Sequence, residues 1–279
     1  MKKEKIIANA KAELMKFQIV AKMESYQSRG IFTSEALLII SIARMLNVKF
    51  IVESGRARGY STKIFAEFFK NDSKVKIISI DFDTNSKDAK YSEEQLRDYK
   101  NVSLIYGDAN NLIADYVKED CLVFIDGPKG DEALLLAAKL IKYSHVKAIC
   151  IHDLHKNTFH RNICEILFTE VFFSDDAEFV KEFEFLDSGC WEKLKVIGES
   201  PYLRKGEKNL SYASTVAVIF SNAHPINERI LENYKEYYLR NNQLVINKFL
   251  KQCLLRCPII ANPVYKIFSF IKRILALTK

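Results

Sequence analysis

Five short apolar runs follow one another between residues 48 and 153 of this chain, and a segment of different character separates each from the next. The runs cover residues 48–54, 75–81, 101–108, 121–126 and 146–153. They are apolar at consecutive positions, whereas a strand with one solvated face would alternate. Helical spacing is found between them, over 61–70, 92–99 and 131–142. Buried strands that alternate with helices predict an α/β fold, a parallel sheet covered by helices on both faces.

Further elements flank this series. One helix is predicted over residues 3–27. A second helix is predicted to end at Leu46, with Thr33 or Ser34 as its capping residue and Glu35 in its first turn. Residues 161–195 indicate more helix and a polar, aromatic-rich stretch, and 210–220 indicate a late strand. The break at Asn222-Ala223-His224-Pro225 suggests a boundary. Three parts follow: an N-terminal helical extension 1–34, an α/β domain 35–222 and a helical tail 223–279.

The first strand runs into a loop that carries two glycines, Glu53-Ser54-Gly55-Arg56-Ala57-Arg58-Gly59, and a helix follows. Glycines let a chain turn tightly and let a ligand approach the backbone. Free N–H groups at the start of a helix bind anionic groups. The glycines are four residues apart, so the G-x-G-x-x-G pattern of dinucleotide sites is a poor match. The loop therefore indicates a ligand-binding turn of another kind, or a tight turn without a ligand.

Polar side chains stand at the carboxyl end of every later strand. They are Asp81 and Asp83, then Asp108, then Asp126, and finally His152, Asp153 and His155. Ligands of open α/β sheets bind at this edge, and an acid after the second strand accepts hydrogen bonds from a ribose diol. The sequence therefore predicts a binding site here, with Asp81 at a ribose.

Taken together, residues 35–222 resemble class I S-adenosylmethionine-dependent methyltransferases. The loop is similar to their motif I, acid-x-G-x-G-x-G, with Ala57 at the middle glycine. Ile125-Asp126-Gly127 and His152-Asp153 resemble the small-molecule O-methyltransferase branch. The resemblance implies a Rossmann-like, mostly parallel seven-stranded sheet whose last strand is antiparallel. It implies that the methionine part of the cofactor is lined by Glu53, Gly55, Ala57 and Gly59, with Asp81 at the ribose and Asp108 at the adenine.

The same resemblance suggests the chemistry at the end of strands four and five. Some relatives hold a divalent metal such as Mg²⁺ there, and Asp126 and Asp153 match its carboxylates. His152 stands where those relatives carry an acid or an amide, which leaves a softer metal or no metal as alternatives. O-methyl transfer needs a base for a hydroxyl proton, and His155 is the candidate. The acceptor implied is a small molecule or a glycan. Lys129 indicates the solvated tip of a Pro-Gly turn, or a partner for a substrate anion.

Two other functions fit part of the sequence. Asp81-Phe82-Asp83 is the Asp-x-Asp pattern with which many glycosyltransferases hold a metal and the diphosphate of a sugar nucleotide. That function would not need the loop with Gly55 and Gly59. A methyltransferase-like body without catalysis, docked on a membrane, is the other alternative. Binding of S-adenosylmethionine separates these possibilities.

The net charge of +7 is concentrated at the C-terminal end. Beyond Glu236 the chain has no acidic residue and eight basic ones: Arg240, Lys248, Lys251, Arg256, Lys266, Lys272, Arg273 and Lys279. Residues 264–275 place aliphatic side chains on one face of a helix. A basic amphipathic helix of this kind suits an anionic membrane surface, or packs on its own domain or on a second subunit of a homo-oligomer. Nucleic acid is not expected, because the tail is rich in aliphatic residues.

The N-terminus lacks the apolar stretch of a signal peptide, and charged residues interrupt it at Glu4, Lys5, Lys11 and Glu13. Six cysteines without CxxC spacing are expected to be reduced thiols. These features predict a cytoplasmic protein, with the tail peripheral on the inner face of the membrane.

Overall fold

A computed structural model describes residues 3–23, 30–72, 74–196, 215–221 and 225–256. The chain divides into two compact units, Met1–Glu228 and Arg229–Lys279. The larger unit holds the sheet and also the N-terminal helix. The second unit begins within one long helix, α10 (Glu228–Arg256). The domain limits expected at residues 34 and 222 stay predictions.

Seven strands form one sheet in the order β3-β2-β1-β4-β5-β7-β6. Their bounds are β1 Phe50–Ser54, β2 Lys76–Asp81, β3 Val102–Tyr106, β4 Cys121–Ile125, β5 Val146–Ile151, β6 Val171–Phe173 and β7 Ala217–Phe220. The first five pair in parallel, and β7 is antiparallel to both of its neighbours. The Rossmann-like sheet with an antiparallel last strand is confirmed. Strand β6 was not predicted, because three residues inside an aromatic-rich stretch leave no periodicity to recognise.

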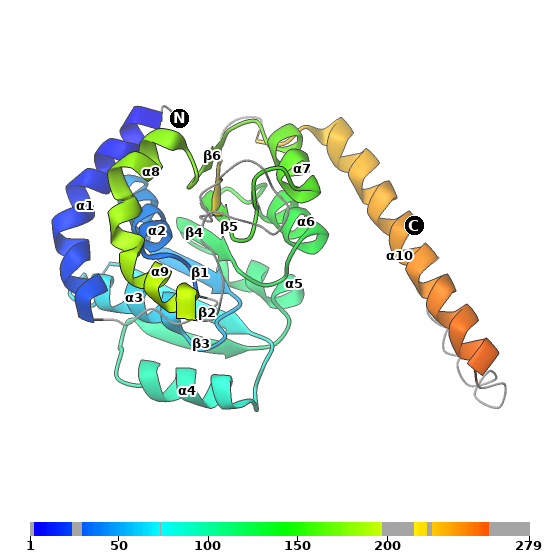
Figure 1. Ribbon diagram of the computed structural model, residues 1–279, viewed down its shortest axis with the longest axis horizontal. Helices are drawn as coiled ribbons and strands as arrows, with labels where there is room; N and C mark the ends of the chain where they lie inside the picture. Colours follow the sequence, from blue (N-terminus) through cyan, green and yellow to red (C-terminus); the bar gives the residue numbers. More distant parts are fainter. Residues whose placement is uncertain (1–2, 24–29, 73, 197–214, 222–224, 257–279) are drawn as a thin grey trace. The chain divides into compact units, whose positions relative to one another are not determined.

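Helices cover both faces of this sheet, with α1, α2 and α3 on one side and α5, α6 and α7 on the other (Figure 1). In the larger unit their bounds are α1 Lys3–Met23, α2 Thr33–Met45, α3 Tyr60–Phe69, α4 Lys87–Leu96, α5 Ala109–Leu112, α6 Asp131–Leu140, α7 Phe159–Leu167, α8 Ala177–Phe183 and α9 Ser188–Val196. Short 3-10 turns occupy Ile113–Tyr116 and Glu184–Asp187. Every residue of β4 is buried, as a strand covered on both faces requires.

The larger hydrophobic core lies between one face of the sheet and α1 to α3. Phe17 of α1 packs against Phe68 of α3 with ring centroids 6.4 Å apart, and Phe65 meets Phe124 of β4 edge-on at 6.0 Å. These four rings are almost fully buried. Burying an aromatic side chain contributes about 1.5–3 kcal/mol, so α1 is part of what stabilises the sheet.

The N-cap residue of helix α2 lies one position before the first of its two expected caps. Phe32 is the N-cap residue, and Thr33 and Ser34 are already helical, so the expected capping role of those two residues is wrong. Carboxylates do the capping instead. Glu35 accepts a hydrogen bond from Phe32 N at 2.8 Å, and Asp187 accepts one from Ser34 N at 2.7 Å. Negative charge at this end suits the helix dipole.

Among the described residues, no helix is both long and apolar enough to cross a membrane. The amphipathic stretch expected at 264–275 lies outside the described residues.

Candidate active site

The loop after β1 is built around three residues with left-handed backbone angles. Gly55, Ala57 and Gly59 have φ of 84°, 46° and 80°. A Cβ on Gly55 would lie 2.6 Å from the backbone N of Gly127 and 2.8 Å from the carbonyl carbon of Asp126. Gly55 is therefore needed for the loops after β1 and β4 to meet. A Gly55→Val variant would separate these loops, so it would not isolate the loss of a ligand contact.

Glu53, at the end of β1, is completely buried. Its carboxyl accepts hydrogen bonds from the hydroxyls of Ser61 at 2.5 Å, Ser79 at 2.6 Å and Thr62. Burial raises the pKa of this carboxyl, while the three hydrogen bonds act in the opposite direction. Glu53 thus joins β1, β2 and the start of α3 beneath the loop. Its contact with a cofactor stays a prediction.

Asp81 is the last residue of β2, and its carboxylate fixes the position of the loop after β1. Its Oδ2 accepts hydrogen bonds from the backbone N–H groups of Arg56 at 2.6 Å and Ala57 at 2.8 Å. Among the described residues, Oδ1 accepts only the N–H of Asp83, at 2.8 Å. A carboxylate oxygen can accept two hydrogen bonds, so Oδ1 retains a position for a ligand hydroxyl. Asp81 is therefore both a structural support of the loop and a group able to bind a diol.

The two other acids on this side of the edge form turns. Asp83 Oδ1 accepts from the backbone N–H groups of Asn85 and Ser86, and hydrogen bonding from Ser86 lowers the pKa of Asp83. Asp108 caps α5 by accepting from Asn110 N at 2.9 Å. It is exposed at the end of β3. Both carboxylates have local partners, and the role of Asp108 at an adenine stays a prediction.

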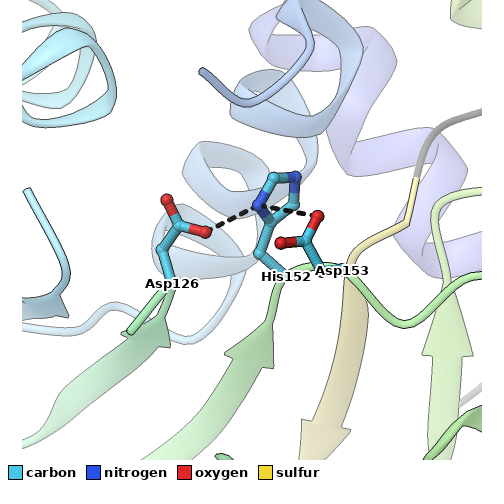
Figure 2. Close-up of side chains that lie close together, drawn as sticks. All are labelled: Asp126, His152 and Asp153. Carbon is cyan, nitrogen blue, oxygen red and sulfur yellow. Dashed lines mark hydrogen bonds and ion pairs between the residues drawn. The ribbon is translucent and has the colours of Figure 1, made fainter. Parts of the chain in front are cut away.

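Asp126, His152 and Asp153 come together at the carboxyl ends of β4 and β5, and their side chains point toward one another (Figure 2). His152 Nδ1 lies 2.7 Å from Asp126 Oδ1 and 3.6 Å from Asp153 Oδ1. Asp153 has φ of 64°, a left-handed conformation that a non-glycine residue rarely adopts. The predicted convergence of these three residues is thus present in the fold.

Lys129 completes this cluster. Its Nζ is paired with Asp126 Oδ1 and lies 2.7 Å from Asp153 Oδ2. Burial lowers the pKa of Lys129, but the two carboxylates raise it further, and the net direction is upward. The lysine is therefore a fixed cation between two acids, which the interpretation as a solvated turn tip did not anticipate.

His152 is surrounded by carboxylates. Its Nε2 lies 3.5 Å from Glu35 Oε2, on the opposite side of the ring from Asp126. Burial lowers the pKa of His152, but Asp126 and Glu35 outweigh burial and raise it well above the ordinary value. Burial acts to raise the pKa of Asp126, yet His152 and Lys129 bring it down to about 2. The facing carboxylates therefore favour the protonated ring, in which both ring nitrogens carry a hydrogen that can be donated.

The ligand atoms of Asp126, His152 and Asp153 lie within 4.8 Å of one another, close enough for one metal ion. The chemistry of the cluster opposes a metal. Lys129 Nζ is paired with both carboxylates, so a metal ion would have to displace this cation as well as a proton of His152. With Lys129 in place, the two carboxylates do not offer a divalent cation an open position, and the metal site expected at Asp126 and Asp153 stays a prediction.

We expect the protein to have the same melting temperature in about 5 mM MgCl₂ as in about 5 mM EDTA. A ligand present at 100 times its Kd would stabilise the fold by about 2.7 kcal/mol. Thermal unfolding monitored by circular dichroism measures this. A rise of several degrees with Mg²⁺ that Asp153→Asn abolishes would establish a metal site.

The three histidines of 152–160 have separate surroundings. His155 is about one-third exposed, with Nε2 3.9 Å from Asp153 Oδ1. His160, on α7, lies 3.1 Å from Asp131 Oδ1 at the start of α6. His155 is therefore beside the cluster and accessible, whereas His160 ties two helices together.

Sequence reasoning missed two residues that contact the cluster. Glu35 is completely buried on α2 and faces His152, and Thr215 accepts a hydrogen bond from Asp153 N at its hydroxyl oxygen, at 3.2 Å. Glu35 was noticed only as an acid in the first turn of a helix, and no spacing connects it to the site. The pairing of Lys129 with Asp126 could have been predicted, since the two residues are three positions apart in one turn.

No protein-family model and no curated protein sequence matches the chain. Among solved structures, the chain is similar to cofactor-bound Rv0187 from MTB, at 17% identity and a TM-score of 0.43, over 77% of this chain and 89% of that one. It is also similar to the O-methyltransferase TomG from Streptomyces achromogenes in complex with SAM, at 16% identity and 0.41, over 80% and 92%. A third is the SAH-bound methyltransferase PaMTH1 from Podospora anserina, at 17% and 0.39, over 76% and 88%.

Proposed function

We propose that the protein is an S-adenosylmethionine-dependent methyltransferase that acts on an oxygen of a small-molecule or glycan acceptor. The observation that carries this proposal is Asp81. Its carboxylate fastens the loop of Arg56 and Ala57 over the end of β2 and keeps an acceptor position at Oδ1. The ionised cluster after β4 and β5 lies along the same edge. The site thus offers a diol acceptor and reactive polar groups side by side.

The residues divide the chemistry between them. Bound S-adenosylmethionine supplies a methyl group on a sulfonium, and transfer forms an O–CH₃ bond as the S–CH₃ bond breaks. His155 accepts the proton of the acceptor hydroxyl, because it is accessible and lies beside Asp153. His152 is less suited to accept it, since its two ring nitrogens face Glu35 and Asp126. Asp126 and Asp153 hold His152 and Lys129 beside the reacting oxygen.

Calorimetry with S-adenosylmethionine, S-adenosylhomocysteine, a UDP-sugar with Mn²⁺, and NAD tests this proposal. We expect binding of the two adenosyl ligands alone. Binding of the UDP-sugar, lost in Asp83→Ala, would favour the glycosyltransferase instead. Binding of none of the four would favour an interaction module without catalysis.

We also propose that the tail binds an anionic membrane surface. Eight basic residues and no acidic residue follow Glu236, and Arg240 pairs back to Glu236, at 3.2 Å. Each contributes about 1 kcal/mol near an anionic bilayer. The full-length variant Lys266→Gln/Lys272→Gln/Arg273→Gln should bind anionic liposomes about a hundredfold more weakly, by sedimentation. High salt should weaken wild-type binding without abolishing it, because the apolar face contributes as well.

The matched control is Lys87→Gln/Lys90→Gln/Lys100→Gln, which removes three exposed charges from the body. An equal loss of liposome binding in both variants would mean that net charge, and not the tail itself, accounts for the binding. Unchanged liposome binding in the tail variant, with a change in oligomer mass by light scattering, would show that the tail contacts a second subunit.

A further inference from the structure

Glu35 is a fully buried carboxyl whose partners come from three separate segments. Oε2 accepts from Phe32 N at 2.8 Å and faces His152 Nε2 at 3.5 Å. Oε1 accepts from Thr215 N at 2.5 Å, a residue 180 positions away in the chain. A buried carboxyl is costly unless it is paired and hydrogen-bonded, and here both oxygens are engaged. Glu35 therefore joins the start of α2, the entrance to β7 and the end of β5.

Thr215 carries this connection to the backbone after β5. Its hydroxyl accepts from Asp153 N at 3.2 Å, and its carbonyl accepts from Leu154 N at 3.0 Å. Asp153 is the residue with the left-handed backbone. Such a conformation persists only where surrounding contacts hold it. The Thr215 contacts hold it, and Glu35 holds Thr215.

We propose that Glu35 is a positioning residue, which fixes the ring of His152 directly and the backbone of Asp153 through Thr215. Its importance for methyl transfer rests on the proposed function, whereas its effect on His152 does not. Glu35 thus acts through the two residues that it orients, His152 and Asp153.

Among the described residues, several titratable groups gather around His152. They are Glu35 from α2, Asp126 after β4, Lys129 in the following loop, and Asp153 and His155 after β5. Glu35 is the one that faces Nε2. Removing its charge leaves Asp126 and Asp153 on the Nδ1 side. The expected result is a weakened hold on the proton at Nε2, with the fold retained.

The experiment measures, by NMR at a fixed pH, how fast the Nε2–H proton of His152 exchanges with water in the wild type and in Glu35→Gln. We expect exchange to be about tenfold faster in Glu35→Gln, because a neutral amide replaces the carboxylate that faces Nε2. Asp187→Asn is the matched control. Asp187 is equally buried and binds Ser34 in the first turn of the same helix. Unchanged exchange in Glu35→Gln, or an equal increase in Asp187→Asn, would overturn the proposal.

If Glu35→Gln does not fold, Thr215→Val tests the link between Glu35 and Asp153 instead. It removes one hydroxyl and keeps the backbone N–H that Glu35 binds. Hydrogen exchange at the Asp153 amide should then be about tenfold faster, as expected when a hydrogen bond of about 1.4 kcal/mol is lost. Unchanged exchange would refute the link through Thr215.

Calorimetry on the wild type keeps the two proposals apart. If S-adenosylmethionine does not bind and His152 still responds to Glu35→Gln, the proposed function fails and the positioning role stands. If the ligand binds and His152 does not respond, the positioning role fails and the proposed function stands.

Discussion

Asp81→Ala is expected to lower the affinity for S-adenosylmethionine by tenfold or more. A hydrogen bond to a charged group contributes about 1.5–3 kcal/mol, and the variant removes the acceptor proposed for the ribose diol. The structure makes the expected loss larger than that single contact, because the same carboxylate holds the N–H groups of Arg56 and Ala57. Calorimetry at 25 °C measures the loss of affinity, and unfolding in urea measures how much the loss of the loop contacts destabilises the fold.

Asp83→Ala is the matched control for this variant. Asp83 is two residues away and accepts hydrogen bonds from the N–H groups of Asn85 and Ser86 in its own turn. It should change the affinity for S-adenosylmethionine less than twofold, roughly 0.4 kcal/mol. Equal losses in the two variants would mean that the turn as a whole, and not the Asp81 carboxylate, supports the ligand.

Asp126→Asn is expected to lower the free energy of unfolding by about 2 kcal/mol at pH 6. The pKa of Asp126 falls from an ordinary 3.8 to about 2 in the fold, and each unit of this shift corresponds to about 1.4 kcal/mol. Because the folded pKa is the lower one, this stabilisation is present above pH 4 and is lost as the pH falls through about 2. The difference between wild type and variant should therefore shrink below pH 4, in urea titrations from pH 6 to pH 3.

His152 gives the opposite dependence. Its pKa is raised in the fold, so its contribution is present below about pH 6.5 and is lost as the pH rises through the folded value. Asp120→Asn serves as the control for both ends of the range, since Asp120 is a half-exposed carboxylate that pairs with Lys147. Exposed pairs contribute about 0–1 kcal/mol. A deficit in Asp126→Asn that is independent of pH, or no larger than that of Asp120→Asn, would contradict the ionised cluster.

The cluster changes the interpretation of the histidines. His155 was the base expected from the sequence, and His152 and His160 lie close to it along the chain. The fold separates them: His152 is buried against Glu35 and Asp126, and His160 is bound to Asp131. His155 remains the candidate base, because it is accessible and lies beside Asp153.

The sequence by itself determined the layout of the protein. Runs of apolar residues predicted β1 to β5 and the late strand, because burial on both faces leaves a local pattern. Since the carboxyl ends of parallel strands share one edge, the same pattern also predicted that Asp81, Asp126 and Asp153 lie along it.

Only the tertiary structure decided what these acids do there. The pairing of Glu35 with His152 and Thr215, and the insertion of Lys129 between Asp126 and Asp153, depend on which backbones lie within a few ångströms. Strand β6 belongs here too, because its three residues become a strand only by pairing with β7. The pattern of apolar residues that burial requires repeats along the chain, so it can be recognised from the local sequence. The charge on a buried group is set by neighbours that packing supplies, and no spacing in the sequence records them.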